Sequence, residues 1–145
     1  MNHWQDLLLE GNKNYNEGEW FQAEQLYRIA EQDLDKFWHQ DQANIELLMA
    51  WVGAAHNLAA VYEKQGDKRI SLQYLIFPHK RMLKLSQGEH NNNELTIAAI
   101  KALKTTLTPI IEYRKKHILC QDCYNALADF NSLKERQEFL LKSYH

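Results

Sequence analysis

The stretch AHNLAAVYEKQGDKRISLQYL, residues 55–75, has the pattern of two helices joined by a tight turn. Small and apolar residues recur at spacings of three and four, the spacing at which side chains share one face of an α-helix. Gly66 can end a helix in a left-handed turn, and Asp67 can cap the helix that follows. The stretch GNKNYNEGEWFQAEQLYRIA, residues 11–30, repeats this pattern around Gly18. The sequence therefore predicts two helical hairpins.

The composition agrees with a helical fold. Five glycines and two prolines among 145 residues leave few positions that interrupt a helix. Valine, a residue typical of β-strands, occurs only twice. Hydrophobic residues make up 45% and charged residues 25% of the chain, as in ordinary globular domains. We therefore predict an all-α fold of antiparallel helical hairpins.

The length of the chain suits one domain with a hydrophobic core, so we predict a single domain over residues 1–145. Residues 1–87 should form two helix pairs. The polar, asparagine-rich segment at residues 88–93 should be a linker. Residues 94–145 should form C-terminal helices, and Ser132 should cap the last of them.

Further expectations concern the ends and interruptions of these helices. Asp41 should cap the third helix and Asp67 the fourth. Pro78 should kink the fourth helix or end it early, and Pro109 should bend or break the fifth. The second helix should bury one stripe of side chains, whose members are Ala23, Tyr27, Ala30, Leu34 and either Phe37 or Trp38.

The pattern of the two hairpins resembles the tetratricopeptide repeat, in which small and aromatic residues occupy set positions. The first hairpin carries the matching residues Gly11, Tyr15, Gly18, Glu19, Trp20, Ala23, Tyr27 and Ala30. The second matches on its first helix through Asn57, Leu58, Ala59, Tyr62 and the turn KQGD, but departs at Leu75 and Pro78. Gly66 follows Gly18 by 48 residues, whereas the period of the family is about 34. The resemblance covers residues 1–87, with one strong and one degenerate repeat.

This resemblance implies hairpins stacked as a short right-handed superhelix with a C-terminal helical cap. Repeats of this kind bury their faces by stacking, so at least about three layers are usual. Residues 94–145 would supply the missing layers as the cap, or a homodimer would bury the open end. The sequence leaves both arrangements open.

The resemblance also implies a concave groove lined by the first helix of each hairpin. Its partner-binding residues would be Leu8, Asn12, Tyr15, Asn16, His56, Asn57, Ala60 and Lys64. Some members of the family clamp a terminal carboxylate there. Asn12 and Asn57 fall at the two asparagine positions of that clamp, while Leu8 stands where the first lysine is expected. The function implied is a non-enzymatic adaptor that binds a peptide or a partner helix of another protein; the alternative is a dedicated small chaperone for one client protein.

A hypothesis from another class is a metal-binding or redox protein centred on His117, Cys120 and Cys123. Helical spacing of three lets two of these side chains share a metal ion. Zinc needs four ligands, however, and the chain has no second cysteine pair. The preferred interpretation is therefore that these residues are packed side chains, with no metal site and no cofactor.

Other classes of function find little support in the sequence. The net charge of −2 argues against nucleic-acid binding, which needs a basic face. The longest nearly apolar run, residues 47–55, is short for a membrane span, and the N-terminus lacks the features of a signal peptide. No catalytic spacing or glycine-rich phosphate loop is present, so we do not expect an enzyme. We expect a cytoplasmic protein that contacts neither nucleic acid nor membrane.

Overall fold

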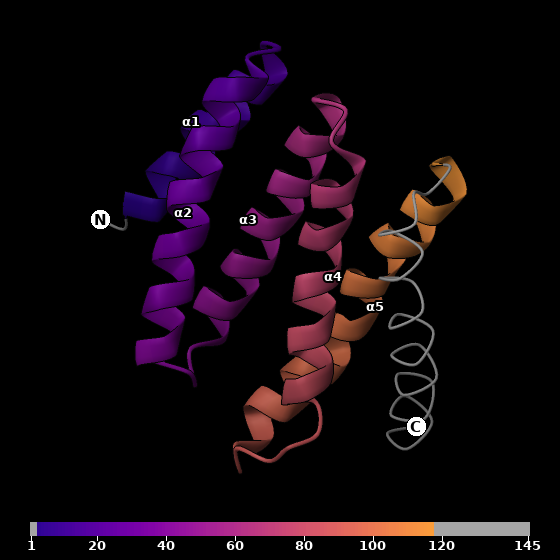
Figure 1. The fold of residues 1–145 in the computed structure, drawn as a ribbon. Helices are drawn as coiled ribbons and strands as arrows, with labels where there is room; N and C mark the ends of the chain where they lie inside the picture. The colour runs from indigo at the N-terminus through magenta and orange to yellow at the C-terminus, as the bar shows by residue number, and fades with distance from the viewer. Residues whose placement is uncertain (1–2, 118–145) are drawn as a thin grey trace. The chain divides into compact units, whose positions relative to one another are not determined.

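A computed structural model describes residues 3–117 of the chain, and every regular element within them is an α-helix. The helices are α1 (His3–Asn16), α2 (Trp20–Gln40), α3 (Ile45–Lys64), α4 (Lys68–Leu85) and α5 (Asn93–Lys116), labelled in Figure 1. Helices that follow one another in the sequence pack together, as α1 does with α2 and α2 with α3. The predicted all-α fold of stacked helices is confirmed for the described part of the chain.

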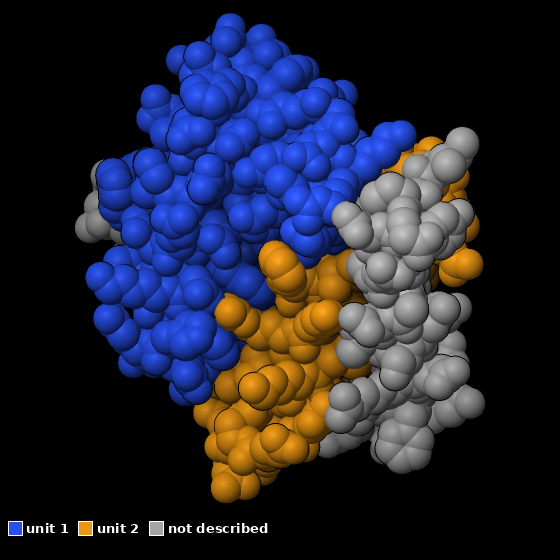
Figure 2. All heavy atoms as spheres, viewed as in Figure 1, with its two compact units in different colours: residues 1–74 blue, residues 75–145 orange. Residues whose placement is uncertain are grey.

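The chain divides into two compact units, Met1–Tyr74 and Leu75–His145, which Figure 2 colours separately. The division falls inside α4, so that helix contributes to both units. The predicted linker at residues 88–93 lies at the start of α5 and in the turn before it, within the second unit. The predicted helix after Ser132 lies outside the described residues.

Both hairpin turns of the first unit use the same backbone hydrogen bonds. Gly18 and Gly66 adopt left-handed φ angles of 79° and 84°. The residue after each glycine donates its N–H to a carbonyl five residues earlier, at 2.9 Å in both turns. This pair of features is the Schellman motif, which satisfies carbonyls that the helix end would leave unpaired. The glycines of the two repeated stretches therefore play identical parts.

Asn44, and not Asp41 as predicted, caps α3. The side-chain oxygen of Asn44 accepts a hydrogen bond from Leu47 N at 3.1 Å. Asp41 lies three residues earlier, where its carboxylate accepts from the Asn44 amide at 3.2 Å. The fourth helix follows the prediction, since Asp67 accepts from Ile70 N at 3.2 Å.

The two prolines do not end their helices. The fourth helix runs through Pro78 to Leu85, and the fifth runs through Pro109 to Lys116. A proline inside a helix costs about 3 kcal/mol because it removes one backbone hydrogen bond. Around Pro78 the buried side chains of Leu75, Ile76, Met82 and Leu83 pack within the second unit, and burial of each apolar side chain contributes about 2 kcal/mol. Packing therefore outweighs the local cost.

One core cluster of the first unit lies between α2 and α3, with side chains of α1 and α4 packed against it. The residues of this core cluster are Ala23, Tyr27, Leu58, Val61 and Tyr62, with Leu8, Tyr15, Trp20, Ile70 and Tyr74 packed against them. Ser71 on α4 donates a hydrogen bond to the Ala59 carbonyl at 2.7 Å, so small residues let α3 and α4 approach closely. Helix α3 is long and apolar enough to cross a membrane by length and composition alone, a test that core helices of globular proteins also meet. Half of its apolar window is buried within the structure.

A buried carboxylate ties α2 to the end of α3. Glu24 is only 9% exposed, and it accepts hydrogen bonds from the Tyr62 hydroxyl at 3.3 Å and from the Gln65 amide at 3.0 Å. Arg28 lies 3.6 Å away on the next turn of α2. Three donors therefore replace the water that a buried carboxylate loses.

Candidate functional site

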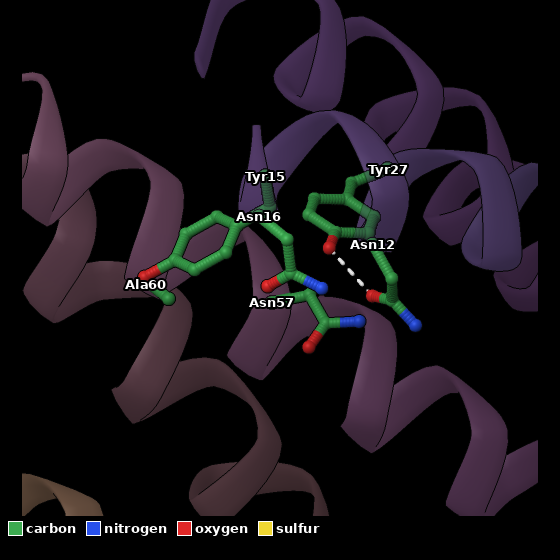
Figure 3. A pocket seen from close by; sticks show the side chains of 6 residues that line it. All are labelled: Asn12, Tyr15, Asn16, Tyr27, Asn57 and Ala60. Carbon is green, nitrogen blue, oxygen red and sulfur yellow. Dashed lines mark hydrogen bonds between the residues drawn. The ribbon is translucent and has the colours of Figure 1, made fainter. Parts of the chain in front are cut away.

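The first unit contains a cavity of about 280 Å³ where α1, α2 and α3 meet, shown in Figure 3. Helix α1 supplies three of its lining residues, α3 supplies two and α2 supplies one. The six residues are Asn12, Tyr15, Asn16, Tyr27, Asn57 and Ala60. We call this space the asparagine cavity.

Helical spacing explains how these residues come together. Asn12, Tyr15 and Asn16 lie at positions i, i+3 and i+4, so they share one face of α1. Asn57 and Ala60 lie at i and i+3 on α3. The small side chain of Ala60 leaves the space open beside them.

Two aromatic rings and a lysine pack beside one another at the edge of the asparagine cavity. The rings of Tyr15 and Trp20 lie 5.1 Å apart between centroids, and they are tilted by 60°. The Lys64 ammonium lies 5.7 Å from the centre of the Trp20 ring, within the range of a cation–π contact. Trp20 therefore lies between Tyr15, which lines the asparagine cavity, and Lys64, which does not.

The polar groups of the asparagine cavity are largely uncommitted. The hydroxyl of Tyr27 donates to Asn12 Oδ1 at 2.6 Å, which leaves the Asn12 amide N–H groups free to donate. The carboxamides of Asn16 and Asn57 make no hydrogen bond within residues 3–117. In Figure 3 the three carboxamides lie around one space. The lining thus offers neutral donors and acceptors and no charged group.

The hydroxyl of Tyr27 fixes the orientation of the Asn12 carboxamide. Its side chain is 2% exposed, and burial, with a smaller effect of the neighbouring Tyr15, raises the pKa of Tyr27 to about 12. The hydroxyl therefore stays protonated at neutral pH and donates to Asn12. The orientation of the Asn12 carboxamide follows from this hydrogen bond.

Replacing Tyr27 by phenylalanine should lower the free energy of unfolding by about 1 kcal/mol, because one intramolecular hydrogen bond is lost. Urea denaturation of both proteins measures the difference. In the alkaline absorbance titration the variant should show one fewer tyrosine ionising near pH 12, where burial places the pKa values of both Tyr27 and Tyr62. An unchanged stability would show that the hydroxyl does not hold Asn12.

The structure brings together five of the eight residues predicted to line a groove: Asn12, Tyr15, Asn16, Asn57 and Ala60. The other three lie elsewhere. Leu8 packs against the core cluster, and Lys64 lies over Trp20. His56 is half-buried, its Nε2 has no hydrogen-bond partner within the described residues, and burial lowers its pKa.

The sixth lining residue, Tyr27, was not among the predicted groove residues. The sequence pattern assigns it to the buried stripe of α2, and its ring is indeed in the core. Only its hydroxyl reaches the asparagine cavity. The choice of tyrosine over phenylalanine at a buried position is the signal that points to a polar partner.

The alternative metal site falls largely outside the described residues. His117 follows the end of α5 and packs its ring 4.3 Å from that of Tyr113. Cys120 and Cys123 lie beyond residue 117. Within residues 3–117 no group of three or more His, Cys, Asp or Glu side chains is placed to hold a metal ion.

The fold and the asparagine cavity define a class: an all-helical protein built from consecutive hairpins, with a neutral polar cavity where three helices meet. A family model described as protein of unknown function (DUF2753) matches residues 2–143, and the chain belongs to that family. Searches of curated proteins and of solved structures return no match to the chain.

Proposed function

We propose that this chain is a non-enzymatic, tetratricopeptide-like adaptor that binds an extended segment of another protein in the asparagine cavity. Two equivalent hairpins support the repeat interpretation. Gly18 and Gly66 end their first helices with the same hydrogen bonds. Gly11 and Ala59 occupy matching positions, and both are buried where a second helix approaches closely.

The observation that carries the proposal is the uncommitted state of the asparagine cavity. A carboxamide presents a donor and an acceptor side by side, as a peptide group does, so it can pair with a main-chain N–H and C=O. The cavity offers the Asn16 and Asn57 carboxamides and the Asn12 N–H groups without a compensating charge. A neutral site of this kind favours main-chain groups over a carboxylate, which needs charge-assisted donors.

The same chemistry favours an extended segment over a helix. In a helix the main-chain groups already pair with one another, whereas an extended peptide exposes them. Tyr15 on the rim supplies an aromatic contact for an apolar side chain of the segment.

A peptide selection tests this proposal. We expect that a library of displayed peptides of about twelve residues, screened against the purified chain, yields a consensus sequence. Substitution Asn16→Arg places a long side chain in the cavity and breaks no hydrogen bond within the described residues. It should weaken binding of the consensus peptide at least about tenfold in fluorescence anisotropy.

The matched control is Gln32→Arg, which adds the same side chain at an exposed position of α2 outside the asparagine cavity. It should bind the peptide as the wild type does. Equal affinities of all three proteins would place peptide binding elsewhere on the molecule and would refute the proposal.

Two alternatives stay predictions. A dedicated chaperone for one client would use the same cavity. It would also keep its client soluble, a property that the peptide assay does not measure. A metal or redox role for Cys120 and Cys123 concerns residues beyond residue 117, and metal analysis of the untagged protein tests it.

A further inference from the structure

A second concave surface lies on the opposite side of α1 from the asparagine cavity. This outer groove has a volume of about 360 Å³ and is lined by Glu10, Asn14, Phe21, Gln22, Gln25 and Leu26. Glu10 and Asn12 are two residues apart, so they point in directions about 200° apart around the helix. A ligand in one site therefore does not occupy the other.

Apolar side chains are exposed in the outer groove and beside it. Phe21 is 65% exposed, and Ile29 on the same face of α2, two turns further on, is 46% exposed. Exposed apolar residues that gather on one face mark surfaces that bind a partner. The remaining lining residues are mostly amides, which can border an apolar contact without a charge.

The edge of the outer groove is acidic. Glu10 lines it, and Asp6 lies one turn earlier on α1, with both side chains exposed. The whole first unit has the same sign: residues 1–74 contain twelve acidic and six basic side chains, a net charge of −6. This balance favours a basic partner.

The second unit has the opposite balance. Residues 75–145 contain seven acidic and eleven basic side chains, a net charge of +4. On α5, Ile97 is 46% exposed, and Lys101 and Lys104 are exposed on the same helical face at i+4 and i+7. One apolar side chain followed by two lysines matches an apolar groove with an acidic edge.

We propose that the outer groove of one copy binds the α5 face of a second copy, head to tail. Ile97 packs against Phe21, while Lys101 and Lys104 lie near Asp6 and Glu10. One helix in one groove buries less than a standard protein interface, so the association is weak, with a Kd on the order of 10 µM. Because the two faces differ, the contact repeats and gives ring or chain assemblies.

Sedimentation velocity of the purified full chain tests this proposal. The weight-average mass of the wild type should rise above that of the monomer at about 100 µM, and a rise in NaCl to about 0.5 M should lower it again. The groove variant Glu10→Lys with Phe21→Ser and the α5 variant Ile97→Ser with Lys101→Glu should each stay monomeric. Both alter exposed side chains, and circular dichroism checks their folding.

Mixing the two variants gives the sharpest result. Each variant keeps the face that the other has lost, so an equimolar mixture should form heterodimers and nothing larger. The control variants Glu46→Lys on α3 and Lys80→Glu on α4 change the same charges at exposed positions outside both faces, and they should associate as the wild type does.

Three outcomes would overturn the proposal. A wild type that stays monomeric at about 100 µM would show that the outer groove does not bind a second copy. A mixture that stays monomeric would refute head-to-tail contact between these two faces. Loss of association in the control variants would show that net charge, and not these surfaces, drives it.

Discussion

The protein should lose about 3 kcal/mol of its free energy of unfolding between about pH 7 and pH 4 through one side chain, His79. His79 lies on α4 in the second unit and is fully buried. Its Nδ1 lies 2.8 Å from the Thr106 hydroxyl oxygen. Thr106 donates its own proton to the carbonyls of Ala102 or Leu103, so its oxygen accepts from the His79 Nδ1–H.

The burial of the second ring nitrogen of His79 accounts for its lowered pKa. Nε2 is buried and has no hydrogen-bond partner within the described residues. Protonation would place a positive charge on this buried ring, and burial therefore lowers the pKa of His79 from 6.5 to about 4. The unfolded chain takes up this proton near pH 6.5, but the folded chain only near pH 4. The stabilisation is thus complete above pH 6.5 and is lost as the pH falls toward 4.

Urea unfolding at about pH 7, 5.5 and 4 measures this loss for the wild type and for His79→Met, which has no titrating group at this position. The difference between the two proteins isolates His79, because the other carboxyl and imidazole groups, His56 among them, are present in both. If the unfolding free energies of the wild type and of His79→Met fall by the same amount as the pH is lowered, His79 is not the group responsible.

The second large effect concerns Gly11, where α1 meets α2. A Cβ atom built on Gly11 would lie 2.5 Å from Cε1 and 2.7 Å from Cδ1 of Tyr27. Tyr27 is 2% exposed and cannot move without disturbing the core cluster. We expect Gly11→Ala to destabilise the protein by about 2 kcal/mol, even though alanine forms helix better than glycine.

The control for Gly11 is a second helical glycine in the same unit. Gly53 on α3 is exposed, and a Cβ added there meets no atom within 4 Å. Gly53→Ala should therefore stabilise the protein by about 0.7 kcal/mol, through helix propensity alone. Thermal and urea denaturation measure whether each substitution lowers or raises the free energy of unfolding. A stabilised Gly11→Ala variant would mean that the two helices do not approach as closely as described.

The hairpins could be predicted from the sequence because their causes are local. A glycine with a left-handed φ ends each first helix, and the apolar spacing on either side fixes the helical face. Between Phe37 and Trp38, the structure buries Trp38, which lies four residues after Leu34 and so stays on the buried stripe.

The features that could not be predicted depend on tertiary packing. The sequence left open whether Pro78 and Pro109 bend or end their helices, and both helices continue through them because neighbouring side chains are buried. The sequence also gave no sign that Leu8 and His56 would turn partly into the structure, or that the Tyr27 hydroxyl would reach the asparagine cavity. The outer groove depends on which side of α2 remains uncovered, and spacing along one helix does not determine that.

The central claim is that the three carboxamides of the asparagine cavity hold an extended peptide, and NMR tests it most directly. In ¹H–¹⁵N spectra, the side-chain NH₂ signals of Asn12, Asn16 and Asn57 should shift on addition of the selected peptide. Those of Asn14, on the opposite side of α1, should stay in place. Peptide binding that leaves the three cavity signals unmoved would contradict this account.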